Sequence, residues 1–319
     1  MTKETNYLFT ISIVIPVFNS AKTVEKLMSE IFTALNADNY AYETIFVNDS
    51  SSDSSSISLD NIYSKYQNIS IIELRKNSGQ DNAIMAGLKY ASGKYIVIMD
   101  DDLQHHPRYI PELLNEMSDY TDVCYANFPN KKQKFYKNLG SWFANSCATI
   151  LLKKPKDIYL SPYKIFNAEI VSEIIKYAGP YPYLDGLIFR VTNKIKQINV
   201  DHSERYAGKG NYTLRKSIKV WANLATNFSI LPLRLSTIFG FLAAISGFLL
   251  GGFYIVSFFL SDHTPEGWSS IAVLVLFFGG IQLIAIGVIG EYLGRLFLLN
   301  NKEPQYVLKQ TKTNITFKE

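Results

Sequence analysis

Three consecutive carboxylates, Asp100, Asp101 and Asp102, are the side chains with the clearest potential for chemistry in this chain of 319 residues. They follow a short apolar run, 94–98, that is typical of a buried strand. Alternate residues of an extended chain point the same way, so Asp100, Asp102 and Gln104 are expected to share a face. Carboxylate and amide oxygens are the ligands that Mg²⁺ or Mn²⁺ prefers, with a substrate diphosphate completing the shell. The triplet therefore predicts a metal site, and the alternative is a solvated acidic turn.

The same kind of polar loop follows three other apolar runs. Strands are expected at 11–16, 42–47 and 69–74, with helices between them at 22–35, from 53 to about 66, and at 81–90. This alternation predicts an α/β fold with a mostly parallel sheet and helices on both faces. The loops carry Asn19, Asp49 and Asn77, and they should meet the Asp triplet along one sheet edge, where a nucleotide could lie. Asp49 only accepts hydrogen bonds, which suits the imide N–H of a base, although capping a helix is an alternative role.

Composition limits the class of protein. The formal net charge of +4 is too small to imply an extended nucleic-acid surface, so no nucleic-acid partner is expected. The two cysteines, Cys124 and Cys147, give neither a disulfide framework nor metal-ligand spacing. The polar start of the chain lacks the plan of a signal peptide, so the N-terminal region is expected in the cytoplasm.

The longest apolar runs all lie after residue 231, and they predict two transmembrane helices at about 233–260 and 268–294. The loop between them has no Lys or Arg, whereas the flanks are basic, so both termini are expected in the cytoplasm. Residues 212–231 combine apolar positions at helical spacing with basic residues, which indicates an interfacial helix. Two pairs of glycines, Gly247 with Gly251 and Gly290 with Gly294, suit helix packing and a homo-oligomer; ordinary membrane-helix composition explains them equally well.

Six segments together resemble one enzyme family. They are 15–19, 47–53, 77–80, 100–104 with Pro107, 202–212 and 290–295. In these segments the chain resembles the inverting, family-2 glycosyltransferases of the GT-A fold. Within that family it is similar to the polyisoprenyl-phosphate glycosyltransferases, the group that includes dolichol-phosphate mannose synthase and the bacterial undecaprenyl-phosphate sugar transferases.

The resemblance implies a separate role for each group of polar residues. The metal, Mg²⁺ or Mn²⁺, would be held by Asp102 and Gln104, while Asp101 faces away. Asp100 and Asp102 would act in catalysis, and Arg205 and Lys209 would hold the phosphate of the acceptor. The residues expected to bind the nucleotide sugar are Pro16, Phe18, Asn19, Asp49, Asn77, Gly79, Gln80 and Asp100.

Several positions depart from the family pattern. Ser20 replaces a usual Glu, and Lys164 stands where many members have Arg. Asp185 is a candidate for contacting the sugar, but a turn role before Gly186 is favoured. The adjacent His105 and His106 are expected to have a loop role, because neighbouring residues rarely converge on one ion.

The expected organisation is a cytoplasmic catalytic domain at 1–211, the interfacial helix at 212–231, a membrane part at 232–299 and a cytoplasmic tail at 300–319. By resemblance, the expected enzyme is a multi-pass protein of the inner or plasma membrane. It would transfer a sugar, from a UDP-linked donor, to a polyprenyl phosphate such as undecaprenyl phosphate. A processive polysaccharide synthase and a non-catalytic membrane scaffold are the alternatives.

Overall fold

The computed structural model describes residues 7–129, 155, 157–179, 181–201, 231–260, 267–301 and 303–315. The chain divides into two compact units. One unit contains Met1–Thr213 together with Lys302–Glu319, and the other contains Leu214–Asn301.

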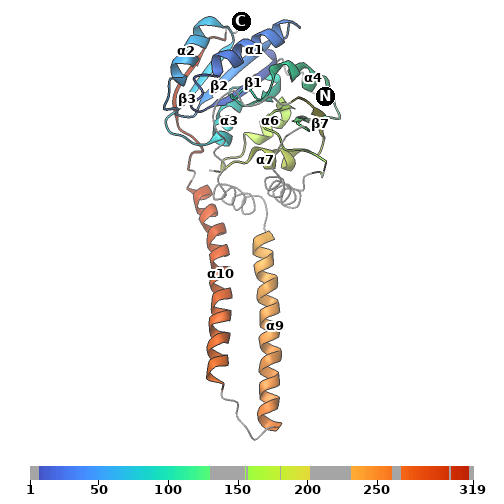
Figure 1. Cartoon of the computed structure of the whole chain (residues 1–319), viewed down its shortest axis with the longest axis vertical. Helices are drawn as coiled ribbons and strands as arrows, with labels where there is room; N and C mark the ends of the chain where they lie inside the picture. Colours follow the sequence, from blue (N-terminus) through green and yellow to red (C-terminus); the bar gives the residue numbers. More distant parts are fainter. Residues whose placement is uncertain are drawn as a thin grey trace. The chain divides into compact units, whose positions relative to one another are not determined.

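An eight-stranded sheet organises the first unit, with the strand order β7-β5-β6-β4-β1-β2-β3-β8 (Figure 1). Its centre consists of four parallel strands, each a β-branched apolar run. These are β1 (Phe9–Val17), β2 (Tyr42–Asn48), β3 (Ile69–Leu74) and β4 (Gly93–Ile98). All four overlap the strands predicted from the sequence. The predicted mostly parallel α/β sheet is therefore confirmed.

Three helices connect the parallel strands: α1 (Val24–Asn36), α2 (Ser55–Lys65) and α3 (Gln80–Leu88). The chain moves outward from β1 to β3 through α1 and α2, and then crosses back to β4 through α3. Because such crossovers are right-handed, α3 lies on the opposite face of the sheet from α1 and α2. On α1, five side chains at helical spacing are fully buried: Val24, Leu27, Met28, Ile31 and Leu35.

Shorter elements extend the sheet beyond β4. After η1 (Pro107–Tyr109) and α4 (Ile110–Asn115), the chain forms β5 (Val123–Asn127). The next strand, β6 (Lys164–Asn167), inserts between β4 and β5 and is antiparallel to both. It is followed by α6 (Ala168–Ile174), α7 (Leu184–Val191) and β7 (Ile195–Asn199), which pairs with β5. Lys164 is paired with Ile98, so it lies at the same sheet edge as the Asp triplet.

The last described segment differs from the expectation of a tail at 300–319. Leu308–Thr313 forms β8, which pairs antiparallel with β3 and completes the other edge of the sheet. The side chain of Asn314 secures its end by accepting from the Ile69 amide at 2.7 Å and donating to the carbonyl of Tyr66 at 2.8 Å. The chain after the second long helix thus belongs to the folded first unit.

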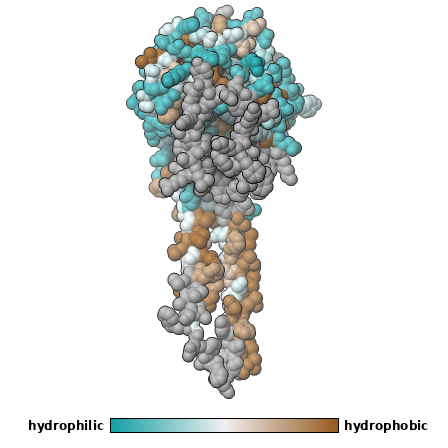
Figure 2. Space-filling model, viewed as in Figure 1, coloured by the Kyte–Doolittle hydropathy of each residue, from teal (hydrophilic) through white to brown (hydrophobic). Residues whose placement is uncertain are grey.

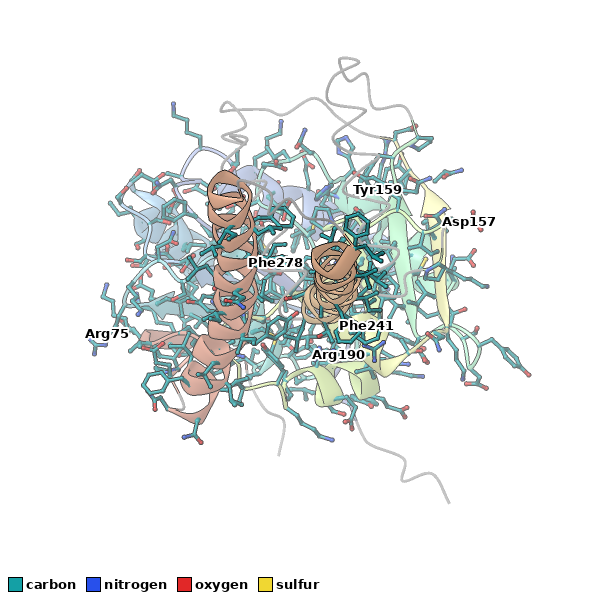
Figure 3. All side chains as sticks on the ribbon, turned by 90° about the horizontal axis from the view of Figure 1, so that it is seen from below. Arg75, Asp157, Tyr159, Arg190, Phe241 and Phe278 are labelled. Carbon is teal, nitrogen blue, oxygen red and sulfur yellow. The ribbon has the colours of Figure 1, made fainter. Side chains whose placement is uncertain are left out.

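The second unit contains two long helices, α9 (Leu231–Leu260) and α10 (Trp268–Asn300). Both are long and apolar enough to cross a membrane, with candidate spans at Leu233–Phe253 and Phe277–Asn300. No part of either hydropathy window is buried, unlike a core helix of a soluble protein, and apolar side chains such as Phe241 project from the helices (Figures 2 and 3). Such a surface needs lipid or protein around it. The predicted interfacial helix at 212–231 lies outside the described residues, apart from its last residue.

Candidate active site

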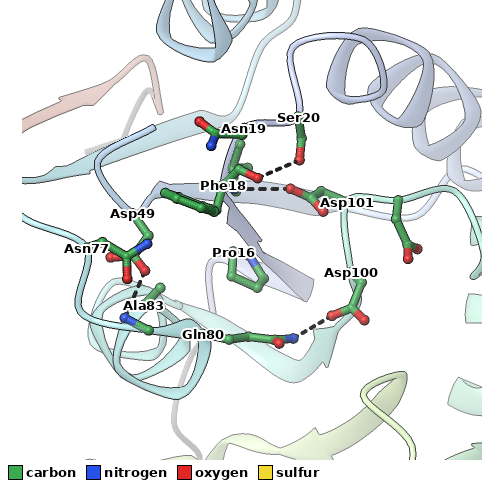
Figure 4. Close-up of a pocket in the computed structure, with 13 residues that line it drawn as sticks. Pro16, Phe18, Asn19, Ser20, Asp49, Asn77, Gln80, Ala83, Asp100 and Asp101 are labelled. Atoms are coloured by element: carbon green, nitrogen blue, oxygen red, sulfur yellow. Dashed lines mark hydrogen bonds between the residues drawn. The ribbon is translucent and has the colours of Figure 1, made fainter. Parts of the chain in front are cut away.

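A pocket of about 410 Å³ opens at the carboxyl edge of the parallel strands (Figure 4). Its walls are the loops after β1, β2, β3 and β4, the position where ligands bind in open α/β sheets. The lining residues are Pro16, Val17, Phe18, Asn19, Ser20, Asp49, Asn77, Gly79, Gln80, Ala83, Asp100, Asp101 and Asp102.

The eight residues predicted to bind the nucleotide sugar all line this pocket, and so does Asp102. Gln104 is not among the lining residues. Arg205 and Lys209, predicted to hold the acceptor phosphate, lie outside the described residues.

Asp49 is a buried carboxylate that fixes the loop between β3 and α3. Its two oxygens accept the backbone amides of Ser78 at 2.7 Å and of Gly79 at 2.9 Å, and Asp49 itself is labelled in Figure 4. Gly79 has a φ of 91°, a backbone conformation that side chains with a Cβ rarely adopt. Asp49 therefore orders the start of α3, not of α2, where Asp53 bonds Ser55. Each Asp49 oxygen has a second lone pair that a base N–H could use.

Asn19 joins the loop after β1 to the loop after β2. Its side-chain oxygen accepts the Ser52 amide at 2.8 Å, and its own amide donates to the hydroxyl of Ser51 at 3.0 Å. The residue has a φ of 56°, which Asn tolerates better than most residues. These bonds hold two walls of the pocket together without any bound molecule.

A stacked histidine supports the loop that carries the Asp triplet. The imidazole of His105 is buried and lies between the rings of Phe128 and Tyr163, with centroids at 5.3 and 5.4 Å. Its Nδ1 accepts the Asp100 amide at 3.4 Å, a role that requires this nitrogen to be unprotonated. The carboxylate of Asp100 in turn accepts from Nε2 of Gln80 at 2.7 Å (Figure 4). His105 thus has a supporting role in the loop, as the sequence predicted.

The expectation that Asp101 faces away is wrong. Its carboxylate accepts the backbone amide of Phe18 at 3.3 Å and lines the pocket (Figure 4). Burial is the main cause that raises the pKa of Asp101 to about 6; hydrogen bonds from Ser20 and Phe18 oppose this rise, and the charge of Asp102 adds to it. The middle carboxylate therefore connects the loop after β4 to the loop after β1.

The chain bends after Asp100, so the expected shared face does not extend to Gln104, although Asp100 and Asp102 both line the pocket. Leu103 has a φ of 62°, a strained conformation for a residue with a branched side chain. The Asp102 carboxylate accepts the Gln104 amide at 3.1 Å, which closes a tight turn. Because the chain turns at Leu103, Gln104 does not continue the alternation of side chains that a strand would have.

The charges of the pocket suit a cation. Asp49, Asp100, Asp101 and Asp102 line it, and no Lys or Arg does so among the residues that the structure describes. Within those residues, no three His, Cys, Asp or Glu side chains converge as a complete metal site. The protein could therefore supply only part of a coordination shell, which fits Mg²⁺ or Mn²⁺ bound jointly with a diphosphate.

A second ionisable cluster lies beside the pocket and was not recognised as a unit from the sequence. Lys164 of β6 is buried, forms an ion pair with Asp185 at the start of α7, and lies over the ring of Tyr125 with Nζ 4.9 Å from its centroid. The Tyr125 hydroxyl donates to Asp185 at 2.8 Å. Asp81 of α3 accepts from the Leu184 amide, and burial and the charge of Asp185 raise its pKa to about 6, although Lys164 opposes this. We call Asp81, Tyr125, Lys164 and Asp185 the Lys164 cluster.

Comparison with known proteins agrees with this geometry. The family model "Glycosyl transferase family 2" matches residues 12–174. The chain belongs to this family. The family resemblance predicted from the sequence is thus confirmed, and the chain is a glycosyltransferase.

Relatives match along nearly the whole length of this glycosyltransferase. An uncharacterised glycosyltransferase of Bacillus subtilis, YkcC, is 31% identical and covers 94% of this chain and 93% of its own. The undecaprenyl-phosphate 4-deoxy-4-formamido-L-arabinose transferase of Photorhabdus laumondii is 30% identical over 95% and 96%. The prophage bactoprenol glucosyl transferase homolog of Escherichia coli is 28% identical over 95% and 99%.

Solved structures confirm the GT-A fold. Glucosyl-3-phosphoglycerate synthase of Mycobacterium tuberculosis, solved with Mn²⁺, uridine diphosphate and phosphoglyceric acid, superposes with a TM-score of 0.52. The two chains are 18% identical, and the match covers 68% of this chain and 76% of the other. At this identity the likeness concerns the fold.

Proposed function

We propose that this glycosyltransferase moves a sugar from a nucleoside diphosphate sugar to a polyprenyl phosphate, with inversion at the anomeric carbon. The observation that carries the proposal is the pocket at the sheet edge, where four acidic side chains and the loops after β1, β2, β3 and β4 meet in a chain that also has two membrane-length helices. Full-length relatives named for transfer to undecaprenyl phosphate or bactoprenol support the choice of acceptor.

The loops after β2 and β3 form the base side of the pocket. Asp49 accepts two backbone amides and keeps further lone pairs, so it can accept the imide N–H of uracil. Pro16 and the half-exposed ring of Phe18 offer apolar surface for the base. A uridine nucleotide fits these features, and UDP is the proposed leaving group.

The loop after β4 forms the diphosphate side. Asp102, which lines the pocket, is the proposed metal ligand, and Gln104, which does not line it, is retained as the second ligand because the family resemblance implies it. Asp100, fixed by Gln80, supports the metal or the nucleotide. When bound, Mg²⁺ or Mn²⁺ would neutralise charge on the departing nucleoside diphosphate. Asp101 holds the opposite loop against this site through the Phe18 amide.

The acceptor requires little acid–base chemistry. A phosphate oxygen is already anionic at neutral pH, so it can attack C1 of the sugar without a strong general base. The protein must then position two anions in line and offset their repulsion. Arg205 and Lys209 are proposed to hold the acceptor phosphate, as the family resemblance implies.

The direct test is product analysis. The full-length protein in membranes would be incubated with undecaprenyl phosphate, Mn²⁺ or Mg²⁺ and each of several labelled nucleotide sugars, and the lipid fraction analysed by mass. With one of the donors, we expect a lipid product in which a single sugar is attached to the phosphate of undecaprenyl phosphate. Growth of a long polymer would favour the processive alternative, and no transfer from any donor would refute the proposal.

Replacement of one ligand tests the site itself. Asp102→Ala should reduce transfer at least a thousand-fold while leaving the melting temperature within a few degrees, because Asp102 lines the pocket and its hydrogen bond with the Gln104 amide closes a local turn. Asp119→Ala is the matched control, since Asp119 is an exposed carboxylate outside the pocket. Wild-type activity in Asp102→Ala would remove this residue from the mechanism.

A further inference from the structure

The order of the strands indicates in which direction a nucleotide sugar would lie along the pocket. From β3, the neighbour of the edge strand β8, toward the other edge of the sheet the order is β3, β2, β1, β4, β6 and β5. The pocket covers the ends of the first four strands, with Asp49 after β2 and the Asp triplet after β4. A nucleotide with its base at Asp49 and its diphosphate at the triplet therefore runs across the strands toward β6.

The Lys164 cluster occupies the next position along this line. Lys164 is the first residue of β6 and pairs with Ile98, two residues before Asp100. Neighbouring strands are about 4.8 Å apart, so β6 lies about 14 Å from β2, a distance that a ribose and a diphosphate can span. Asp81 directly follows Gln80, which lines the pocket and bonds Asp100.

The Lys164 cluster is largely buried and comes from several elements, so it is not a chance contact of surface charges. Only 3% of the Lys164 side chain and 13% of the Asp185 side chain are exposed. Four elements contribute, because Asp81 comes from α3, Tyr125 from β5, Lys164 from β6 and Asp185 from α7. Burying a lysine and two carboxylates costs free energy that only close pairing offsets, so a purely apolar contact here would have served stability equally well.

We propose that the Lys164 cluster is the sugar-recognising wall of the donor site and that it selects sugars without a carboxylate. With one ammonium and two carboxyl groups, the cluster is neutral or negative, never positive. Carboxylate oxygens can accept from sugar hydroxyls, whereas a hexuronate would place a like charge in a poorly hydrated site. The assignment rests on the proposed function, because it takes the donor to be a nucleoside diphosphate sugar.

Three ligands separate binding of the nucleoside diphosphate from binding of the sugar and of its C6 substituent. The affinities of UDP, UDP-glucose and UDP-glucuronic acid would be measured by calorimetry on the full-length protein in detergent with Mn²⁺. The two sugar nucleotides differ only at C6 of the sugar. We expect wild-type protein to bind UDP-glucose at least ten-fold more tightly than UDP-glucuronic acid. Equal affinities would overturn the proposal.

Conservative variants test the cluster. Asp185→Asn keeps the size and one acceptor oxygen, and it should reduce the preference for UDP-glucose at least five-fold while changing UDP affinity less than two-fold. Tyr125→Phe removes only the hydroxyl that bonds Asp185 and should weaken UDP-glucose without weakening UDP. Each variant would be checked by its melting temperature with and without UDP, so that a folding defect is distinguished from loss of recognition.

A matched control comes from the opposite edge of the same strands. Asp122 accepts from Asn167 and Thr192 just before β5, so Asp122→Asn disturbs a comparable polar network far from the pocket. It should leave all three affinities unchanged. If Asp185→Asn behaved like this control, or lowered UDP affinity as much as UDP-glucose affinity, the cluster would be structural. If UDP did not bind the wild-type protein, the uridine diphosphate donor of the proposed function would fail, independently of the cluster.

Discussion

The surroundings of Asp81 disfavour the ionised form of its carboxyl group. Burial is the main cause, the nearby Asp185 adds to it, and together they raise the pKa of Asp81 from 3.8 to about 6 despite Lys164. The folded protein therefore binds this proton more tightly than the unfolded chain. Between pH 4 and 6 the folded state carries the extra proton, so this residue's contribution to the free energy of unfolding falls as pH rises through that window.

The variant Asp81→Asn should remove this pH dependence. Asn keeps an oxygen that can accept the Leu184 amide but has no charge to bury. Relative to wild type, the variant should gain stability as pH rises from 4 to 7, by at most about 3 kcal/mol. Melting temperatures of both proteins across this range would show it. Asp119→Asn, at an exposed position, is the control, and a constant difference between Asp81→Asn and wild type would contradict the assignment.

At the Asp triplet, the sequence predicts the place but not the orientation of each side chain. Position after an apolar strand is a local property, so the pocket edge could be predicted. The surroundings of Asp101 are not local, because its partner Phe18 lies 83 residues earlier in the chain. The turn at Leu103 also escapes prediction, since a leucine with positive φ breaks the usual residue preferences. The Lys164 cluster combines four distant segments, and only Lys164 and Asp185 had individual signals.

At the scale of elements, β8 shows where sequence patterns fail. The four parallel strands are β-branched and buried, so their composition predicted them. Leu308–Thr313 is polar and almost wholly exposed, with no alternation to indicate a strand. It is held by pairing with β3, by Lys309 with Glu73 and Lys312 with Asp60, and by the bonds of Asn314. These interactions depend on residues far away in the chain, so the sequence of 308–313 alone does not indicate a strand.

Asn314 should therefore contribute more to stability than its exposed strand suggests. Its side chain accepts the Ile69 amide and donates to the carbonyls of Tyr63 and Tyr66 at 3.0 and 2.8 Å. Asn314→Ala leaves these backbone groups without their partner and should lower the free energy of unfolding by about 2 kcal/mol. Gln310→Ala, at an exposed position on the same strand, should change it by less than about 0.5 kcal/mol. Equal melting temperatures for the two variants would show that β8 is dispensable.

For the whole molecule, the pairing of β8 with β3 constrains how the chain can cross a membrane. Residues on both sides of α9 and α10 belong to one sheet, since β7 precedes the helices and β8 follows them. A sheet cannot form across a bilayer, so if both helices span a membrane, the chain leaves and returns on the same side. From the basic flanks and the loop without Lys or Arg, we propose that this side is the cytoplasm.

Cysteine labelling tests this topology. In a chain with Cys124→Ala and Cys147→Ala, a single cysteine is introduced either in the loop, as Asp262→Cys, or after the second helix, as Glu303→Cys. In intact cells a membrane-impermeant thiol reagent should label the first variant, and it should label the second only after lysis. Retained transfer activity would show that both variants are folded. Labelling of both positions, or of neither, in intact cells would rule out a hairpin of two membrane-spanning helices, and with it the constraint that β8 places on the rest of the chain.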